Sequence, residues 1–398
     1  MRRSLFVSTA LAALLVAAPV RAEDEPPAPA AAEPTPLRPA VELKPIRLPF
    51  ALEHLAPPGS DRPKGWRPAT TTQPESAPTT AALLRLARAA GVDGDKVAAR
   101  CIPVAKGESE STVQGTLGYL VVGVEAKTLT PKLAEAAAAH GWRTKNIAVP
   151  SAVLITWAAD DEDEAALQAW QTETAVHNLC AKGWDDMTTA RQEFDQNVAR
   201  TKFARGQACI AAARDTLPEA AYVNAILAQI FGRQADRALE HARKALKSDA
   251  PVPAPDAMVV TAAFTVGGAL LTTGTEADVA EALAALKRGV AAEAAAETPF
   301  HRFGNRYNLA CCYARQDKLD PAFEHLEESL RYLKDAWVAD KAKSSEGTSR
   351  LNYPSHYEHA KTRDTDMEPL RADPRFAKLM EAYHPDAKAP GAEKKDEK

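Results

Sequence analysis

Apolar positions recur every three to four residues through most of the chain after residue 165, which predicts a mainly helical region. The first helices are expected at 165–180, 187–214, 220–232 and 235–247. The stretch 257–275 has nineteen residues without a charge, enough to raise the question of a membrane span. Its threonines and the Gly267–Gly268 pair lower its hydrophobicity, so we expect a helix buried among neighbours.

The clearest pattern lies at 307–330, which reads as two short amphipathic helices joined by a polar turn. Ala310 and Ala322 are small enough to let the two backbones approach each other. The apolar residues expected to fill the space around them are Leu309, Tyr313, Phe323, Leu326 and Leu330. One such hairpin cannot bury its apolar face alone, so neighbouring hairpins should stack against it.

Weaker copies of the second-helix pattern precede this hairpin. The small residues Ala238, Ala280 and Ala322 are evenly spaced, 42 residues apart. Even spacing of this kind is typical of a helical solenoid, in which each unit packs against the next.

The segment 303–336 resembles a tetratricopeptide repeat, a helix–turn–helix unit. The matching residues are Leu309, Ala310 and Tyr313 in the first helix and Ala322, Leu326 and Ser329 in the second; Arg306 stands where the family has tryptophan. Residues 364–376 resemble the segment that often closes such arrays in bacterial proteins. The resemblance implies a stacked-helix binding scaffold, without indicating what it binds.

The closing segment is expected to act as a cap over the last hairpin. Its apolar residues are Met367, Leu370, Phe376, Leu379 and Met380. Pro369 and Pro374 should fix its turns, and Asp373 should cap a short helix that begins at Pro374.

Strand signals occur only before the acidic run 160–164. Residues 118–124 and 152–157 read as strands. A helix capped by Thr130 and ended by Gly141 lies between them, and another helix, 81–90, ends at Gly91. Strand, helix and strand together predict a small βαβ-like unit.

The N-terminal residues predict export. Residues 1–22 combine two arginines, an apolar stretch and small residues before Glu23, as in a secretory signal peptide; the stretch is too short to favour a membrane anchor. Residues 23–79 hold fourteen of the 29 prolines and should form a disordered tether. The expected organisation continues with an α/β unit at 80–160, a helical repeat domain with its cap at 161–385, and a charged disordered tail at 386–398.

Charge and cysteine content narrow the function classes. The chain has 49 basic and 53 acidic residues, and the leader removes three arginines but no acid. This balance argues against nucleic acid or an anionic membrane surface as a partner. The five cysteines are an odd number, and Cys311 and Cys312 are adjacent. We expect the cysteines to be small buried side chains. A single disulfide, Cys101–Cys180 or Cys180–Cys209, is the alternative.

Few residue patterns in the sequence suggest catalysis or metal binding. His356 and His359 are one helical turn apart and could hold a metal, but no third ligand stands out beside them. Asp364 and Asp366 are too easily supplied by chance, so a surface helix or loop is the preferred interpretation. No nucleophile elbow, Walker motif or His-Glu-x-x-His motif occurs. We therefore predict no enzyme, metal or cofactor. The alternatives are an enzyme or metal-binding protein with its site in the α/β unit or at His356 and His359, and a structural envelope component.

The preferred function is an exported, non-enzymatic scaffold that binds a protein or peptide in the periplasm or outside the cell. No integral membrane span is expected after leader cleavage. Four polar residues of the best repeat are predicted to contact the partner, by hydrogen-bonding an extended backbone or clamping a carboxylate. They are Asn305, Arg306, Asn308 and Arg315.

Overall fold

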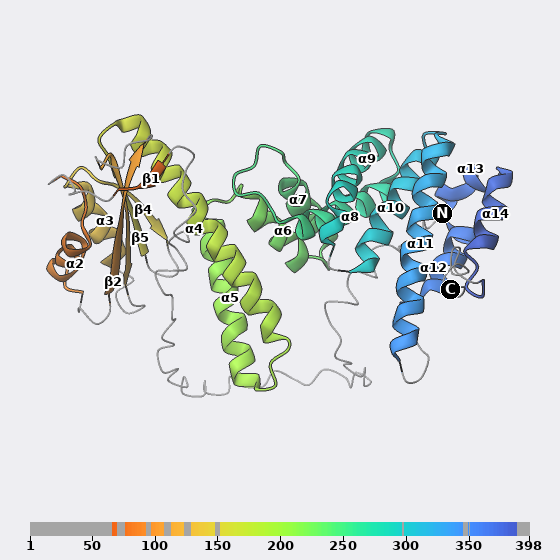
Figure 1. The fold of residues 1–398 in the computed structure, drawn as a ribbon, viewed down its shortest axis with the longest axis horizontal. Coiled ribbons are helices and arrows are strands. Elements are labelled where there is room, and N and C mark those ends of the chain that lie inside the picture. Colours follow the sequence, from red (N-terminus) through yellow and green to blue (C-terminus); the bar gives the residue numbers. More distant parts are fainter. Residues whose placement is uncertain are drawn as a thin grey trace, which may run out of the picture. The chain divides into compact units, whose positions relative to one another are not determined.

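The computed structural model describes residues 66–69, 76–92, 97–106, 113–122, 129–147, 152–296, 298–344, 349 and 351–387 (Figure 1). The predicted signal peptide, most of the predicted tether and residues 388–398 lie outside this part. The described chain is mainly helical with one small antiparallel sheet. Two compact units divide between Val223 and Asn224. The boundary expected near residue 160 therefore falls inside the first unit.

The first unit holds the sheet and a long helical hairpin. Its elements are β1 (Trp66–Pro68), α2 (Thr80–Ala89), β2 (Val97–Lys106), β3 (Gly115–Val122), α3 (Thr130–Ala138), β4 (Arg143–Ile147), β5 (Ala152–Ala158), α4 (Asp161–Ala190) and α5 (Gln196–Thr216).

The strand order is β1-β2-β3-β5-β4, and every neighbouring pair is antiparallel. The two strands expected from the sequence are neighbours, with Gly118 opposite Ile155, but they are not the parallel pair of a βαβ unit. The strand that follows α3 is β4, which was not predicted from the sequence. β5 then inserts between β3 and β4, so the βαβ-like prediction is wrong in its pairing.

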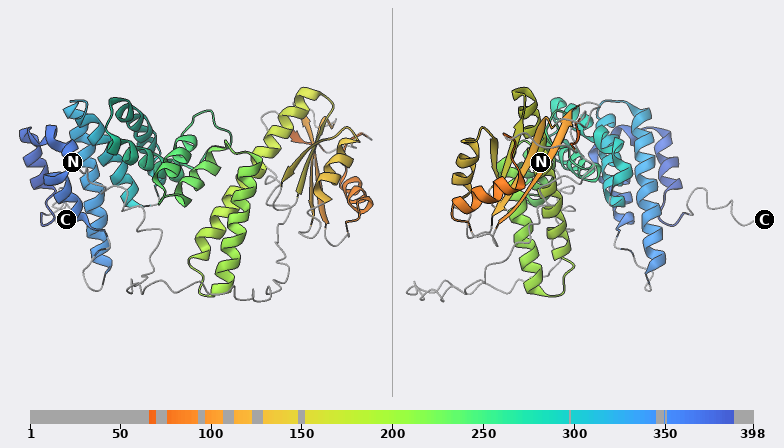
Figure 2. Two further views of the ribbon diagram at one scale, coloured as in Figure 1. Left: turned by 180° about the vertical axis from the view of Figure 1, so that it is seen from behind. Right: turned by 60° about the vertical axis from the view of Figure 1, so that its left-hand side comes forward.

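Helices cover both faces of the sheet (Figure 2). On one face, α2 and α3 bring Leu83 and Leu133 against Leu120 and Ile155 in a single buried cluster. On the other face, the amide of Gln171 on α4 donates to the Gly118 carbonyl oxygen and accepts from the Thr156 hydroxyl, both at 2.8 Å. The sheet is thereby enclosed, and α4 belongs to its core.

Part of the predicted tether is ordered. Trp66 lies on β1 and is buried, and β1 pairs with the end of β2. The Trp142 indole donates to the Ser76 carbonyl oxygen at 2.8 Å, and the Thr79 hydroxyl caps α2. The folded unit therefore begins before residue 80, because a tryptophan inside the proline-rich stretch supplies the apolar surface that the stretch as a whole lacks.

Two glycines, Gly183 on α4 and Gly206 on α5, let the backbones of the two helices approach closely. A Cβ on Gly206 would lie 2.6 Å from the Gly183 carbonyl oxygen, so no other residue allows this approach. The helix expected at 187–214 is in fact divided, because α4 runs on to Ala190 and α5 begins at Gln196. The Asp195 carboxylate caps α5 by accepting from the Asn197 and Val198 amides at 2.8 and 3.3 Å.

The described residues of the second unit form helices joined by turns and loops, without a strand. α6 (Ala221–Ile230) crosses the boundary between the units. The later elements are α7 (Ala235–Ala245), α8 (Asp256–Thr273), α9 (Glu276–Ala291), η4 (Glu293–Ala295), α10 (Pro299–Ala314), α11 (Leu319–Lys343), α12 (Tyr353–Glu358), η5 (His359–Arg363), η6 (Thr365–Met367), α13 (Glu368–Arg371) and α14 (Pro374–Ala382).

The uncharged stretch forms α8, which packs against α7, α9 and α10. By length and composition alone, α8 could cross a membrane, and 61% of its residues are buried inside the unit. Gly267 lets Leu286 of α9 approach so closely that a Cβ there would lie 2.5 Å from a Leu286 methyl carbon. This burial agrees with the expectation of a core helix.

The predicted hairpin at 307–330 is α10 and α11. Ala310 and Ala322 are completely buried where the two helices meet, together with Leu326 and Leu330. The three equally spaced alanines do not share one role: Ala238 and Ala322 are buried, but Ala280 is exposed. α9 instead buries Val279, Ala282, Ala285, Leu286 and Gly289.

Most of the apolar residues expected to close the helix stack are buried. Met367 and Leu370 are fully buried, and Phe376 and Met380 nearly so. The Asp373 carboxylate accepts from the Arg375 amide at 2.9 Å and caps α14. By contrast, Thr130 lies inside the first turn of α3, and Leu129 occupies the cap position without a side-chain bond.

Replacing Ala322 by tryptophan should destabilise the α10–α11 hairpin. The Ala322 side chain is fully buried, so the larger ring overpacks the contact and should cost about 1–3 kcal/mol. Thermal unfolding followed by circular dichroism measures the effect. Ala292→Trp, at a half-buried residue beyond the end of α9, is the control and should cost much less. Equal melting temperatures for the two variants would contradict the hairpin contact.

Candidate functional site

Two of the four predicted binding residues are inside the protein. Asn305 is 0% exposed, and its amide donates to the Val260 carbonyl oxygen of α8 at 2.9 Å. Asn308 is 3% exposed. Both lie on the side of α10 that packs into the unit, so the expectation of an exposed polar groove is wrong for them. Their amides are buried within the helix stack.

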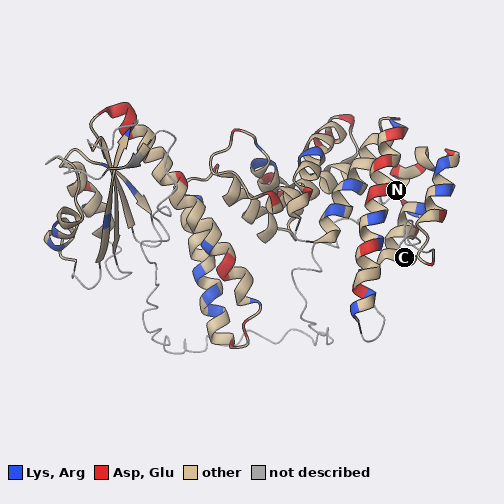
Figure 3. Ribbon diagram, in the orientation of Figure 1, with Lys and Arg blue, Asp and Glu red and all other residues tan. Residues whose placement is uncertain are grey.

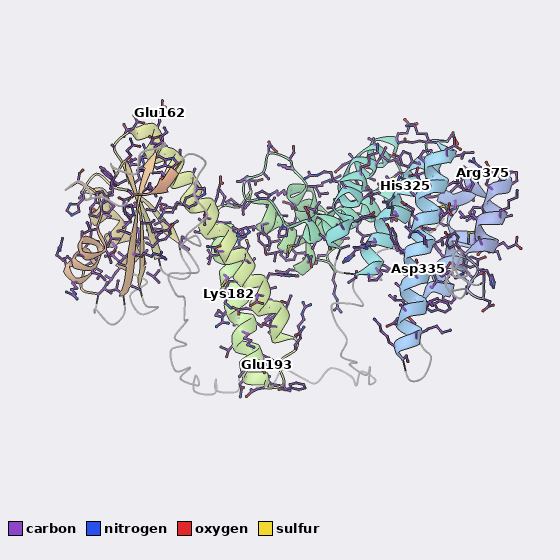
Figure 4. The ribbon with its side chains drawn as sticks, in the orientation of Figure 1. Glu162, Lys182, Glu193, His325, Asp335 and Arg375 are labelled. Atoms are coloured by element: carbon purple, nitrogen blue, oxygen red, sulfur yellow. The ribbon has the colours of Figure 1, made fainter. Side chains whose placement is uncertain are left out.

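Arg306 is engaged in an ion-pair network. Its guanidinium donates to Glu293 Oε1 at 2.6 Å and to Glu328, and it also lies 3.1 Å from His325 Nδ1. The hydrogen bond to Glu293 raises the pKa of Arg306 further. His325, labelled in Figure 4, stacks on Tyr313, and burial lowers its pKa. The Arg306 charge is therefore balanced within the chain.

Arg315 joins three segments. Its guanidinium donates to Asp366 Oδ1 and Oδ2 at 2.8 and 2.9 Å. It also donates to the Leu271 carbonyl oxygen, near the end of α8, at 2.7 Å. Arg315 thus fastens α8 and α10 to η6, and its contacts are structural.

Arg315 belongs to a group of polar side chains that we call the α10–η6 cluster. Tyr307 and Cys311 on α10 and Arg315, the residue that caps its C-terminal end, are four residues apart and therefore lie on one side of the helix. They meet His359, Asp364 and Asp366, which come from η5, the residue before η6, and η6 itself. The Tyr307 hydroxyl donates to Asp364 Oδ2 at 2.6 Å, and Cys311 Sγ lies 3.8 Å from the same oxygen. His359 Nε2 is 3.7 Å from it.

The local fold holds Asp364 in this orientation. Its Oδ1 accepts from the Asp366 amide at 2.9 Å and so caps η6. Its carbonyl oxygen accepts from the Arg371 guanidinium. Because Oδ1 and the backbone are both engaged, Oδ2 is directed at α10.

Burial governs the protonation of the α10 members of the cluster. It raises the pKa of the Tyr307 hydroxyl well above its usual value, and the neighbouring Asp364 carboxylate raises it further. The pKa of the Cys311 thiol is raised by burial first and then by Asp364 and Asp366. Both groups hold their protons at neutral pH and act as hydrogen-bond donors.

The structure separates the two histidines that the sequence paired. His356 packs its ring against Phe300 and Phe303, with centroid distances of 5.8 and 5.1 Å, and burial lowers its pKa. Only His359 lies beside the carboxylates of the cluster. Cys311, Asp364 and Asp366 each offer a metal-ligand atom, and these atoms all lie within 4.8 Å of one another. The Asp-x-Asp spacing at 364–366 was the one sequence signal for this group.

A second candidate surface lies at the turn between α4 and α5. Phe194 is 101% exposed, and Val198 and Phe203 on α5 are 41% and 38% exposed. The neighbours of Phe194 hold the turn in place, because Glu193 pairs with Lys202 at 2.6 Å and Asp195 caps α5 (Figure 4). Figure 3 shows lysine and arginine positions along α5. An aromatic ring is thus displayed to solvent from an ordered turn.

The five cysteines are unpaired. Cys180, Cys209, Cys311 and Cys312 are buried and Cys101 is half-buried, as expected of small side chains packed in a core. None of the protein-family models, curated proteins or solved structures compared with this chain matches it.

Proposed function

We propose that the protein is an exported, non-enzymatic scaffold that binds a protein or peptide in the periplasm or outside the cell. The helices from α8 onward then form a tetratricopeptide-like solenoid, closed by the segment from α12 to α14. The α8–α9 and α10–α11 packing, together with the buried apolar residues of the closing segment, supports this architecture.

The partner surface is proposed to lie at the α4–α5 turn. Of the polar residues first considered for binding, Asn305 and Asn308 are buried and Arg306 and Arg315 pair with acidic residues of the second unit, whereas Phe194 projects fully into solvent. An apolar residue just before a helix cap often packs on the fourth helical residue, here Ala199, but Phe194 is too exposed to do so. The ring therefore contributes little to the hairpin itself. Aromatic side chains are common anchors of protein interfaces.

The observation that carries this proposal is the exposed Phe194 in a turn whose backbone is fixed on both sides. Val198 and Phe203 provide further apolar surface on α5. A partner that covers these residues removes apolar area from water without having to order the turn first.

Site-specific photo-crosslinking tests the proposal. A photoreactive phenylalanine analogue at position 194 of the full mature chain should give a discrete protein adduct in envelope extract. The same analogue at position 280, where Ala280 of α9 is exposed, is the matched control and should give little. Phe194→Ser, examined with a crosslinker at position 198, should lose the adduct without a change in melting temperature. Adducts of equal yield at 194 and 280, or none at 194, would contradict the proposed surface.

A further inference from the structure

We propose that the α10–η6 cluster is a binding site for a zinc-class divalent metal ion, with Cys311 Sγ, His359 Nε2 and the carboxylates of Asp364 and Asp366 as its four ligands. This site is independent of the proposed partner surface, which lies in the other unit.

The ligand chemistry is that of zinc. One thiolate, one imidazole and two carboxylates are the donor types that zinc takes in four-coordinate sites. Calcium and magnesium, which prefer all-oxygen sites with six or more ligands, do not fit a site that contains a buried thiol. Cys311 is 2% exposed, so its sulfur is shielded from bulk water.

The distances are close to those of a closed site. Metal–ligand bonds of about 2.0–2.3 Å place the ligand atoms of a tetrahedral site roughly 3.3–3.8 Å apart. Cys311 Sγ and His359 Nε2 lie 3.8 and 3.7 Å from Asp364 Oδ2. The ligand atoms of Cys311, Asp364 and Asp366 lie within 4.8 Å of one another. Three ligand atoms are therefore already grouped, and the His359 ring, which approaches Asp364, has to move toward Cys311 and Asp366 to complete the site.

The charges of the cluster also match a divalent cation. Asp364 and Asp366 contribute two negative charges against the single positive charge of Arg315. When the ion binds, the Cys311 thiol loses its proton to solvent and a metal–sulfur bond forms. Two carboxylates and one thiolate then balance the divalent ion and the guanidinium, which leaves a neutral, largely buried group.

Neighbouring residues already orient the ligands. Arg315 holds Asp366 through two hydrogen bonds, and Tyr307 donates to Asp364. Such outer contacts fix ligand geometry and strengthen metal binding. Because the ligands come from α10 and from the segment after α12, the ion would tie the closing segment to the helix stack. Its role would be structural.

The test uses the untagged mature chain, residues 23–398, reduced and freed of metal with a chelator. Titration with zinc chloride alone, followed by calorimetry in two buffers of different ionisation enthalpy, should show one saturable site that releases about one proton per ion. Cobalt(II) at the same site should give the near-ultraviolet charge-transfer absorption of a cobalt–thiolate bond.

The variants separate a metal site from a hydrogen-bond network. Cys311→Ser, which is nearly isosteric, should abolish the cobalt–thiolate absorption, and Asp364→Asn and His359→Gln should each weaken zinc binding by about tenfold or more. Cys180→Ser and His356→Gln are controls outside the ligand set and should bind normally. Absence of saturable zinc binding by the reduced wild-type chain at about 100 μM would overturn the proposal, since a closed four-ligand site binds far more tightly. Binding that survives in Cys311→Ser with its cobalt spectrum unchanged would overturn it as well.

Discussion

Ending the chain at Arg363 should give a destabilised, self-associating protein, whereas ending it at Asp386 should leave stability unchanged. The shorter chain lacks Met367, Leu370, Phe376 and Met380, all of them buried. Burying a side chain of this size contributes about 1.5–3 kcal/mol, so the four together approach the 5–15 kcal/mol that separates folded from unfolded domains.

Polar contacts add to the effect of this truncation. Tyr357 donates to the Met380 carbonyl oxygen at 2.7 Å, and the ammonium group of the buried Lys334 donates to the His384 carbonyl oxygen at 2.8 Å. Ending the chain at Arg363 leaves both donors without their acceptors and exposes the apolar surface they adjoin, which favours association.

Thermal unfolding and light scattering after size-exclusion chromatography measure the two properties. Leu370→Ala in the full chain provides a graded control and should cost about 2–5 kcal/mol. A monomeric chain ending at Arg363 with the melting temperature of the intact protein would show that the segment is not a cap.

Asp186→Asn should lower the free energy of unfolding by about 3 kcal/mol at pH 7, because it breaks a buried ion pair between α4 and α5. The Asp186 side chain is 2% exposed and accepts from Lys182 Nζ at 2.7 Å and from Arg205 Nε at 2.5 Å. This cost is at the low end for buried ion pairs because Lys182 and Arg205 are both partly exposed to solvent. Asp185→Asn is the matched control: its carboxylate is 63% exposed and 3.7 Å from Lys182, so the cost should stay below about 1 kcal/mol.

The Asp186 effect should depend on pH in a defined direction. Burial opposes ionisation of this carboxyl, but the hydrogen bonds from Arg205 and Lys182 outweigh it and hold the pKa below its usual value of 3.8. A depressed pKa gives stability that is complete above the unfolded-state value and lost as the pH falls through the folded-state value. The difference between the wild type and Asp186→Asn should therefore be constant near neutral pH and shrink below about pH 4. Urea unfolding across this range measures it; a difference that grows in acid would contradict the assignment.

The helical features that the sequence predicted are those with local causes. The burial of Ala310 and Ala322 between α10 and α11, the uncharged helix α8 and the Asp373 cap each depend on one short stretch of the chain. The division between α4 and α5 had a local signal too, because Asp195 is a good cap residue. The continuous apolar spacing around it hid that signal.

The missed strands have weak patterns of their own. β4 contains one apolar residue in five, Ile147, and is recognisable only by its pairing with β5. β2 is rich in small apolar residues without a regular apolar–polar alternation and includes Pro103, so its strand character depends on β1 and β3 on either side. Pairing between distant segments also placed Trp66 in the sheet rather than in a tether.

The candidate sites were predicted poorly for the same reason. Cys311 and Asp364 are 53 residues apart in the chain, and only the folding of the closing segment onto α10 brings them together. Asn305 was expected at the surface because it is polar. The close approach of α10 to Val260 of α8, however, places its amide inside, where it satisfies a backbone carbonyl.

The continuity of α4 gives the first unit a mechanical property. Its N-terminal part packs on the sheet through Leu167 and Gln171, and its C-terminal part meets α5 backbone to backbone at Gly183. Thirty helical residues span about 45 Å without a break. The same helix is thus part of both the sheet's core and the α4–α5 hairpin. Because one continuous helix joins them, the sheet and the α4–α5 turn that carries Phe194 are held a fixed length apart.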